Sequence, residues 1–444
     1  MPRNKSFVPS HEPLSSHESL EIIHERTHGP FSFLNPTKTH FRHKDLSQKP
    51  SNPTSGQETT SSDEEKATPN KDEEYASKVQ YQWRSRDNRK GRHALVVDKS
   101  ESSGTDTYIV PKSTHTFRQA MKGIWRMFTV YPVWDVSYLV ATIFTLGSIV
   151  WVINAFFVWL PLVDPPTKFP GEITSGGGIS AFIGATIFEI GSVLLMFEAV
   201  NENRAGCFGW ALEQVLEGEA GKWRLKPDKG QCSHHHHNKK NFVGKGVADS
   251  SQIPSSSSAD SNDSQEKVPE NDAMNSSDKR TWHWFPTWHE LTTHYFREIG
   301  FLASFSQMCG ATIFWISGFT ALPSINTSLA DTSQGLLDGV YWVPQVIGGS
   351  GFIISGILFM LETQKNWYTP SWKVLGWHIG FWNLIGAIGF TLSGALGMAY
   401  ASSGAQYEAS LATWWGSWAF LIGSAIQWYE CLDTHPVEEK GKGD

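Results

Sequence analysis

Residues 184–198 are GATIFEIGSVLLMFE, and two later stretches follow the same pattern: GGSGFIISGILFMLE at 348–362 and GSWAFLIGSAIQWYE at 416–430. The shared pattern, Gly-x3-Phe-x-Ile-[Gly/Ser]-[Gly/Ser]-x5-Glu, aligns without a gap. The recurring Gly, Phe, small and Glu positions hold Gly184, Phe188, Gly191 and Glu198, then Gly348, Phe352, Ser355 and Glu362, then Gly416, Phe420, Gly423 and Glu430. Offsets of 4, 7 and 14 residues place these side chains on one stripe of a helix. We therefore predict three equivalent packing helices.

Each stretch lies in an apolar run long enough to cross a bilayer. A spanning helix needs about 20 apolar residues, because lipid offers the backbone no hydrogen-bond partner. Only the second run carries a charged residue near its middle, Glu189. The six runs are 136–160, 178–199, 299–322, 339–361, 377–401 and 411–430. Many of the 20 Trp residues flank these runs, where an interfacial belt is expected. The sequence thus predicts an all-α polytopic membrane protein with six transmembrane helices.

The runs that alternate with the three stretches share a looser pattern. It comprises Gly147, Trp151 and Asn154, then Gly310, Phe314 and Ser317, then Gly386, Phe390 and Ser393. Small residues let neighbouring helices approach closely in lipid, and each Phe would act as a knob against the next helix. We predict three repeated membrane hairpins at 134–201, 297–366 and 377–433. The pattern leaves open whether they form a closed bundle or an open row.

Most of the charge lies outside the apolar runs. Residues 1–114 and 202–296 are rich in Ser, Thr and charged residues, a composition that predicts a disordered tail and a largely disordered loop. Residues 434–444 form a second tail. Residues 115–133 alternate apolar and basic positions at helical spacing, which predicts either an amphipathic helix on an anionic membrane surface or an extension of the first span.

Lys and Arg counts predict the orientation. The tail and the long loop are basic, and the connection 362–376 carries Lys365 and Lys373, whereas Lys168 is the one basic residue of the opposite connections. Both termini and the long loop should therefore face the cytosol. The sequon at Asn326 then falls on the outer side, as a glycosylation site would, whereas Asn4, Asn262 and Asn275 would be chance sequons. The first residues offer no apolar stretch for a cleavable signal peptide. The sequence does not distinguish the plasma membrane from an endomembrane.

The recurring Glu198, Glu362 and Glu430 end their helices on the predicted cytosolic side. A carboxylate at a helix C-terminus opposes the helix dipole, so we expect a cation beside each, with Arg126, Arg297 or Lys373 as candidates. The three carboxylates are either a cytosolic mouth that attracts cations or structural ion pairs.

Glu189 lies near the middle of its run, where a charge is costly. It is either an ion- or proton-binding site or a carboxyl group bonded to a polar residue inside the bundle. The polar candidates are Asn154, Gln307, Gln345 and Asn383.

The sequence contains no complete catalytic, metal-binding or nucleic-acid-binding motif. His289 and His294 are five residues apart, so they face different sides of a helix and cannot share a metal as in His-Glu-x-x-His. Cys232 with His234 to His237 is at most an adventitious metal site. The four cysteines are scattered and predict no disulfide framework. We expect no cofactor, no metal site and no nucleic-acid partner.

The two-helix unit, with Gly-x3-Phe-x-Ile-Gly-Ser in its second helix, resembles the YrhK-like membrane domain and the multi-pass membrane proteins of fungi that carry such hairpins. The resemblance covers 134–201, 297–366 and 377–433. It implies an architecture of repeated hairpins and no particular reaction.

Two classes of function remain. The first is a membrane protein without catalytic activity that organises, senses or recruits, with the bilayer and cytosolic proteins as its partners through the tail and loop. The second is an ion- or proton-coupled transporter or channel that uses Glu189. The oligomeric state is not indicated.

Overall fold

The computed structural model describes residues 7, 20–43, 79–92, 94–97, 114–202, 208, 282–433 and 436–439. The predictions for Cys232, for His234 to His237 and for the sequons at Asn4, Asn262 and Asn275 lie outside these residues. So does most of the predicted long loop.

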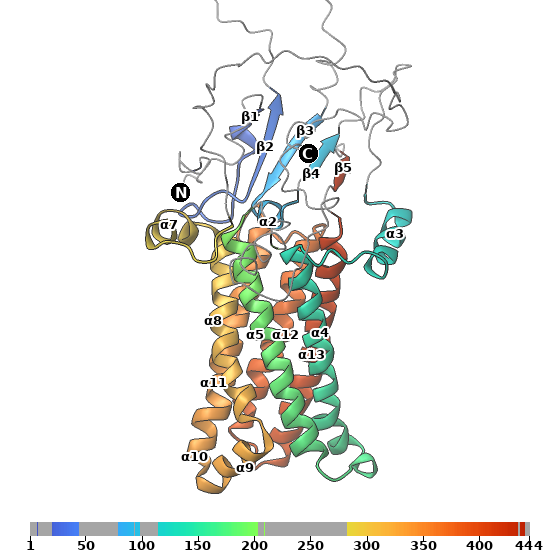
Figure 1. Cartoon of the computed structure of the whole chain (residues 1–444), viewed down its shortest axis with the longest axis vertical. Coiled ribbons are helices and arrows are strands. Elements are labelled where there is room, and N and C mark those ends of the chain that lie inside the picture. The colour runs from blue at the N-terminus through green and yellow to red at the C-terminus, as the bar shows by residue number, and fades with distance from the viewer. Residues whose placement is uncertain are drawn as a thin grey trace, which may run out of the picture.

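Six long helices form the body of the molecule (Figure 1). They are α4 (Val136–Val163), α5 (Gly178–Val200), α8 (Ile299–Thr320), α11 (Val343–Glu362), α12 (Leu375–Gly397) and α13 (Ser403–Cys431). Wider helical turns lengthen two of them, with η4 (Glu172–Gly177) leading into α5 and η8 (Asp338–Trp342) leading into α11. Short elements join the helices at one end: η3 (Pro165–Thr167), α9 (Pro323–Thr332) and α10 (Gln334–Leu337).

Five of these helices are long and apolar enough to cross a membrane: α4, η4 with α5, α8, α10 and η8 with α11, and α12. The prediction of several membrane-spanning helices is therefore confirmed in its general form. By length α13 would also qualify, but it is not among the five because Ser, Gly and Trp lower its mean hydropathy. Trp counts as a weakly polar residue on hydropathy scales, although it is common at the ends of membrane helices.

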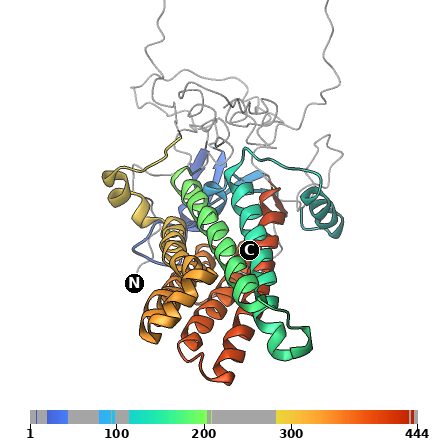
Figure 2. The same cartoon turned by 60° about the horizontal axis from the view of Figure 1, so that its bottom comes forward.

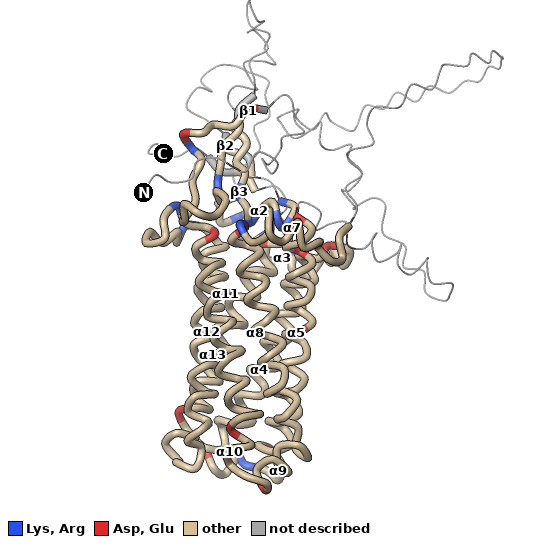
Figure 3. The backbone as a smooth tube through the Cα atoms, turned by 90° about the vertical axis from the view of Figure 1, so that its left-hand side faces the viewer, with Lys and Arg blue, Asp and Glu red and all other residues tan. Residues whose placement is uncertain are grey.

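The six helices form a closed ring rather than an open row. Each packs along the next helix in the sequence, and α13 closes the ring against α4. Figure 2, in which the lower end of Figure 1 comes forward, shows the helices around a common axis. Most of their length carries no charged residue, as Figure 3 shows by its tan colour.

The helix faces explain this arrangement. Phe188, Phe352 and Phe420 are buried, whereas the Ile two residues after each is about half exposed on the outside of the ring. Two residues turn a helix by about 200°, so each Phe and its following Ile lie on opposite faces. An apolar outer face with an apolar interior is the expected result for helices surrounded by lipid.

A five-stranded sheet covers one end of the ring, which we call the sheet end; the other is the loop end (Figure 1). Its strands, in spatial order, are β1 (Leu20–Ile22), β2 (Lys38–His43), β3 (Val79–Arg84), β4 (Ala94–Val97) and β5 (Val437–Glu439). The first four pair antiparallel, and β5 pairs parallel to β4 with Val96 opposite Glu438.

The sheet corrects three predictions. The fold is mostly helical but not all-α, residues 20–43 and 79–97 of the predicted disordered tail contain four strands, and the C-terminal tail contributes β5. The physical reason lies in the alternation of β3, where Tyr81 and Trp83 are buried and pack with Phe41 and Phe7. Period-2 alternation with aromatic residues is typical of a half-buried strand.

Two short helices project from the sheet end, on opposite sides of the ring in Figure 1. They are α3 (Phe117–Met127) and α7 (Trp288–Thr293), the latter followed by η7 (Tyr295–Arg297). Residues 128–135 separate α3 from α4, so the alternative of a simple extension of the first span is wrong. Phe117 and Trp125 of α3 are 82% and 69% exposed.

Candidate functional site

A basic segment, residues 84–92, is seated on the sheet end of the ring. It follows β3 directly and contains the short helix α2 (Ser85–Arg89), which ends with Gly91 in the left-handed conformation. Glycine adopts that conformation without steric cost, and here it turns the chain back so that Arg92 also faces the ring. Arg86, Arg89, Lys90 and Arg92 are all at least 95% buried.

Arg89 joins two of the recurring glutamates. Its Nη1 donates to Glu198 Oε1 at 2.7 Å, and its Nη2 donates to Glu362 Oε2 at 2.8 Å. Ser85 Oγ donates to the other oxygen of Glu362 at 3.1 Å. The guanidinium also lies over the ring of Phe359, 5.1 Å from its centre. One arginine therefore links the C-terminal ends of α5 and α11.

Glu430, the third recurring glutamate, binds three cations. Arg86 Nη2 donates to Glu430 Oε2 at 2.7 Å, and Arg92 Nη2 and Lys90 Nζ lie 3.2 and 3.6 Å from the same oxygen. Arg92 Nη1 also donates to the Glu430 carbonyl oxygen at 3.0 Å. Burial lowers the pKa of Lys90 to about 8, with Arg86 adding to this effect and Glu430 opposing it.

Two glycines make room for these cations. A Cβ at Gly300 would overlap the Glu362 carboxylate, and a Cβ at Gly376 would lie 2.6 Å from Arg86 Nε. Both glycines are the second residue of their helices, α8 and α12. The ring is therefore shaped to receive the basic segment.

A further carboxyl group joins the N-terminal strands to the ring. Asn35 Nδ2 donates to Glu298 Oε1 at 2.5 Å, at the start of α8. Burial and the neighbouring Glu202 raise the pKa of Glu298 to about 8, while His294 and the Asn35 bond act in the opposite direction. Glu298 is therefore largely protonated at neutral pH.

The predicted cation beside each recurring glutamate is present, but its predicted source is wrong. Among ion pairs that join described residues, those of Glu198, Glu362 and Glu430 come from residues 86–92 and not from Arg126, Arg297 or Lys373. The physical reason is that the tail folds back on the ring. The three carboxylates are structural ion partners here rather than an open mouth.

Six aromatic side chains fill the axis of the ring half-way along it; we call them the aromatic layer. They are Trp151, Phe188, Phe314, Phe352, Phe390 and Phe420, the aromatic positions of the two sequence patterns. Ring centres lie 4.8 Å apart for Trp151 and Phe390 and 5.5 Å apart for Phe188 and Phe420. These are the separations of favourable edge-to-face pairs.

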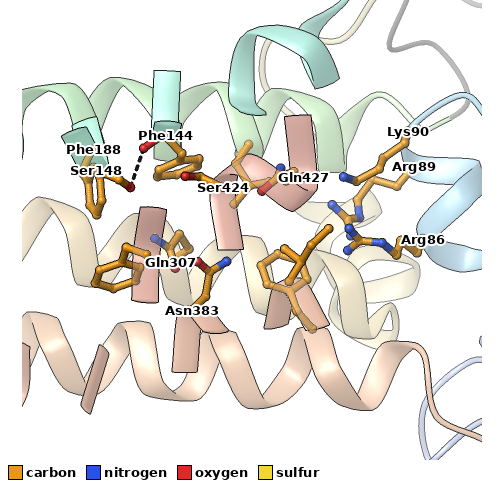
Figure 4. Close-up of a pocket in the computed structure, with 14 residues that line it drawn as sticks. Arg86, Arg89, Lys90, Phe144, Ser148, Phe188, Gln307, Asn383, Ser424 and Gln427 are labelled. Atoms are coloured by element: carbon orange, nitrogen blue, oxygen red, sulfur yellow. Dashed lines mark hydrogen bonds between the residues drawn. The ribbon is translucent and has the colours of Figure 1, made fainter. Parts of the chain in front are cut away.

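A small inner pocket of about 30 Å³ lies between the aromatic layer and the basic segment (Figure 4). Figure 4 shows Arg86, Arg89 and Lys90 at one end and Phe188 at the other. Gln307, Asn383, Ser424 and Gln427 lie between them. This volume holds about two water molecules.

An outer cavity of about 440 Å³ lies on the other side of the aromatic layer, toward the loop end. Trp151, Phe314 and Phe390 belong to both the layer and the lining of this cavity. Asn154, Ser317 and Ser393, the third positions of the looser pattern, line it as well, with Gln345 and Thr413 from α11 and α13. The lining contains no Asp, Glu, Lys, Arg or His among the described residues.

Glu189 lies on the outer side of the ring, not on its axis. Glu189 is half-buried beside the neighbouring helix α8: its Oε1 accepts a hydrogen bond of 3.0 Å from Thr312, and its Oε2 is buried and accepts no hydrogen bond from a described residue. The predicted partners are elsewhere: Asn154 and Gln345 line the outer cavity, and Gln307 and Asn383 line the inner pocket. The preceding residue, Phe188, faces the axis, and one residue turns a helix by about 100°.

The predicted packing residues lie at helix contacts. A Cβ at Gly184 would lie 2.9 Å from the indole of Trp151, and one at Gly348 would lie 2.7 Å from the Gly310 carbonyl oxygen. Similar contacts surround Gly191, Gly416 and Gly423, and Ser355 is buried. Asn326 lies in α9, half-buried, where its Nδ2 donates to the Thr320 carbonyl oxygen at 3.3 Å.

The rejected zinc motif has a structural role. Thr287 and Glu290 form a capping box at the start of α7, with Glu290 Oε2 accepting from the Thr287 backbone at 2.8 Å. Within the described part of the chain, no group of three His, Cys, Asp or Glu side chains could hold a metal ion.

The basic segment is the part of the site that sequence reasoning missed. Its sequence, RSRDNRKGR at 84–92, carries five basic residues and follows the alternating strand VQYQWR. That juxtaposition was the available signal. No protein-family model matches the chain, and no curated protein and no solved structure matches it.

Proposed function

We propose that the chain is a six-span integral membrane protein without catalytic activity, which holds a folded cytosolic unit against the bilayer and organises, senses or recruits through it. The observation that carries the proposal is the basic segment seated on Glu198, Glu362 and Glu430. Buried ion pairs of this kind fix one arrangement, because an unpaired buried charge is costly.

The position of the two chain ends supports six spans. The strands β4 and β5 pair at the sheet end, where α4 begins and α13 ends. A chain that leaves and returns to the same side of a membrane crosses it an even number of times. Five crossings by the most apolar helices therefore require a sixth, by α13.

The distribution of basic residues supports a cytosolic sheet end. That end carries the basic segment and Arg118, Lys122 and Arg126 of α3, whereas the connections at the loop end carry only Lys168. The exposed apolar side chains of α3 suit the membrane surface beside the ring. The recurrence of the Phe, Ile and Glu positions around the ring supports an origin as three YrhK-like hairpins.

The test separates the cytosolic unit from the ring. In Arg86→Gln/Arg89→Gln, two cations that bind the three glutamates are lost; in the control Arg118→Gln/Lys122→Gln, two exposed cations of α3 are lost. The measurement is proximity labelling of cytosolic proteins by an enzyme fused after residue 444, with membrane insertion verified for each chain. We expect the labelled set to change in the first variant and to persist in the control. An unchanged set in the first variant, with the strands released, contradicts the proposal.

A second candidate, a transport pathway along the ring axis, is favoured by the two spaces on either side of the aromatic layer. In that case the layer would be the closed constriction, and Glu189, on the outer side, would not be the coupling group. The test is uptake of protons and common cations into proteoliposomes by the wild type, Phe390→Ala and Glu189→Gln. Flux that rises in Phe390→Ala and persists in Glu189→Gln supports the axial pathway; the absence of flux in all three supports the organising function.

A further inference from the structure

The outer cavity has the size and composition of a ligand site. Its volume of about 440 Å³ lies in the range of small-molecule pockets, roughly 300–1,000 Å³. Its lining combines aromatic rings with a few uncharged polar groups. We infer that this cavity binds an uncharged organic molecule that carries a hydroxyl group on an apolar body. The inference holds for an organising protein and for a transporter alike.

The hydrogen bonds of the lining define what the ligand must offer. Asn154 Nδ2 donates to the Gly177 carbonyl oxygen at 2.6 Å and to Ser180 Oγ at 3.0 Å. Gln345 Nε2 donates to the Phe390 carbonyl oxygen at 3.2 Å. The two side-chain carbonyl oxygens accept no hydrogen bond from a described residue. An amide carbonyl of this kind can accept two hydrogen bonds, so these groups call for a donor such as a hydroxyl.

The hydroxyl groups of the lining also form hydrogen bonds within the protein. Thr413 Oγ1 donates to Ser393 Oγ at 2.8 Å, which joins α13 to α12. Thr413 has one hydroxyl hydrogen and is also placed to donate it to the Ala409 carbonyl oxygen at 3.1 Å, so the Ser393 hydrogen is available to a ligand oxygen when Thr413 donates to Ser393. A hydroxyl on the ligand can both donate to the amide oxygens and accept from Ser393.

The described residues of the lining carry no charge, which disfavours ionic ligands. An ion that enters such a cavity loses the free energy of its hydration, and no counter-ion compensates for that loss. The rings at the cavity wall suit an apolar body, since Trp342 lies 4.3 Å from Tyr341 and 5.5 Å from Tyr400 between ring centres. Such rings could also bind an organic cation by its positive charge, and the experiment distinguishes that case.

The experiment measures saturable binding of four matched probes to the full chain in nanodiscs, with empty nanodiscs subtracted. The probes are 2-naphthol, 2-methoxynaphthalene, 2-naphthoate and 2-naphthyltrimethylammonium. We expect 2-naphthol to bind at least fivefold more tightly than the methyl ether, which cannot donate, and the two ions to bind more weakly still. Tighter binding of the ether, the anion or the cation, or no saturable binding of naphthol, overturns the inference.

Two variants place the binding in the cavity. Ser393→Phe places a phenyl ring among the polar groups of the cavity lining and should weaken naphthol binding at least tenfold. Leu392→Phe, at an exposed position on the outer face of the same helix, should leave naphthol binding unchanged. Gln345→Leu keeps the volume and removes the acceptor, so it should reduce the preference for naphthol over its ether even if Ser393→Phe does not fold. Binding that is equal in wild type, Ser393→Phe and Gln345→Leu overturns the site.

A last arm identifies the source of the natural ligand. Nanodiscs that contain diacylglycerol, a hydroxylated lipid, are compared with nanodiscs that lack it. Competition with naphthol assigns a ligand from the bilayer, and unchanged naphthol affinity assigns a water-borne alcohol. Either result leaves the hydroxyl-binding site in place.

Discussion

The two ends of the ring are built from the same six helices but differ in charge and in packing. At the sheet end, four buried cations meet the three recurring glutamates and Asp87, which lies 3.6 Å from Arg92, and about 30 Å³ of space remains beside them. At the loop end, the described residues that line a cavity of about 440 Å³ include no charged side chain, and two amide oxygens accept no hydrogen bond from a described residue. The basic segment of the chain itself fills the sheet end, whereas the cavity at the loop end has room for a ligand.

This difference separates the end that should determine stability from the end where we infer binding. A buried ion pair is destabilising when one partner is lost, so the sheet end tolerates little change. A side chain that faces the open cavity has little packing to lose on that side, so volume-conserving substitutions there should cost little. The following predictions test that contrast.

The largest effect is expected for Arg89→Met. It leaves Glu198 and Glu362 buried without their cation, which should destabilise the docked segment by about 3–5 kcal/mol. The measurement is hydrogen exchange of the Ser85 and Lys90 amides, converted to a free energy of opening. Lys122→Met, on the exposed face of α3, is the control and should leave these amides unchanged. Equal protection in both variants contradicts the contrast.

A smaller effect is expected for Gly300→Val. Its side chain would overlap the Glu362 carboxylate and displace it from Arg89, at a cost of about 1–3 kcal/mol typical of overpacking. Gly335→Val at the loop end is the matched control, because no atom lies within 4 Å of a Cβ there. Hydrogen exchange of the same amides checks both, and a loss of protection in the control alone contradicts the prediction.

A pH-dependent effect is expected at Glu298. Its pKa is about 8 when the strands are docked and near the ordinary value of 4.5 when they are released. The docked state therefore binds more protons between these values, so the contribution of Glu298 to docking is fully present below about pH 4.5 and is lost as the pH rises through 8. In Glu298→Gln the free energy of docking should vary less between pH 5 and 8. His294, whose pKa Glu202 raises against the effect of burial, contributes in the same direction, whereas His40 of β2, whose pKa burial lowers to about 3, acts in the opposite direction. An unchanged slope in Glu298→Gln contradicts this assignment.

The smallest effect is expected at the loop end. Gln345→Leu loses one hydrogen bond to Phe390 and keeps its volume, so the stability of the ring should change by no more than about 1.5 kcal/mol. Thermal unfolding in nanodiscs measures it beside Arg89→Met. A loss as large as that of Arg89→Met would remove the distinction between the two ends.

The sequence predicts the ring better than it predicts what sits on it. Helix periodicity and apolar length identify α4, α5, α8, α11 and α12, and the recurring Phe positions meet in the aromatic layer. The strands are short and far apart in the sequence, and the wholly apolar β4 has only four residues, so Tyr81 and Trp83 in the alternating β3 are the clearest signal of the sheet.

The sequence likewise indicates some residues of the candidate site and not others. The recurrence of Glu198, Glu362 and Glu430 identifies them in the sequence. The sequence around Arg86 and Arg89 is rich in polar and charged residues and predicts that they are exposed to solvent, and only the tertiary structure shows that they are buried. Glu189 illustrates the reverse case. A mid-span position along the helix does not by itself say which face of the helix a side chain occupies.

The docking of the basic segment also orders the biogenesis of the protein. Arg86 and Arg89 leave the ribosome before any of their partners, and Glu430 is the last of the three glutamates to be translated. The strand β5 follows it and completes the sheet beside β4. In a chain interrupted before α13, Arg89 could still pair with Glu198 and Glu362, but Arg86, Lys90 and Arg92 would lack Glu430 and β4 would lack β5. The sheet end is therefore completed only after α13 and β5 have been translated.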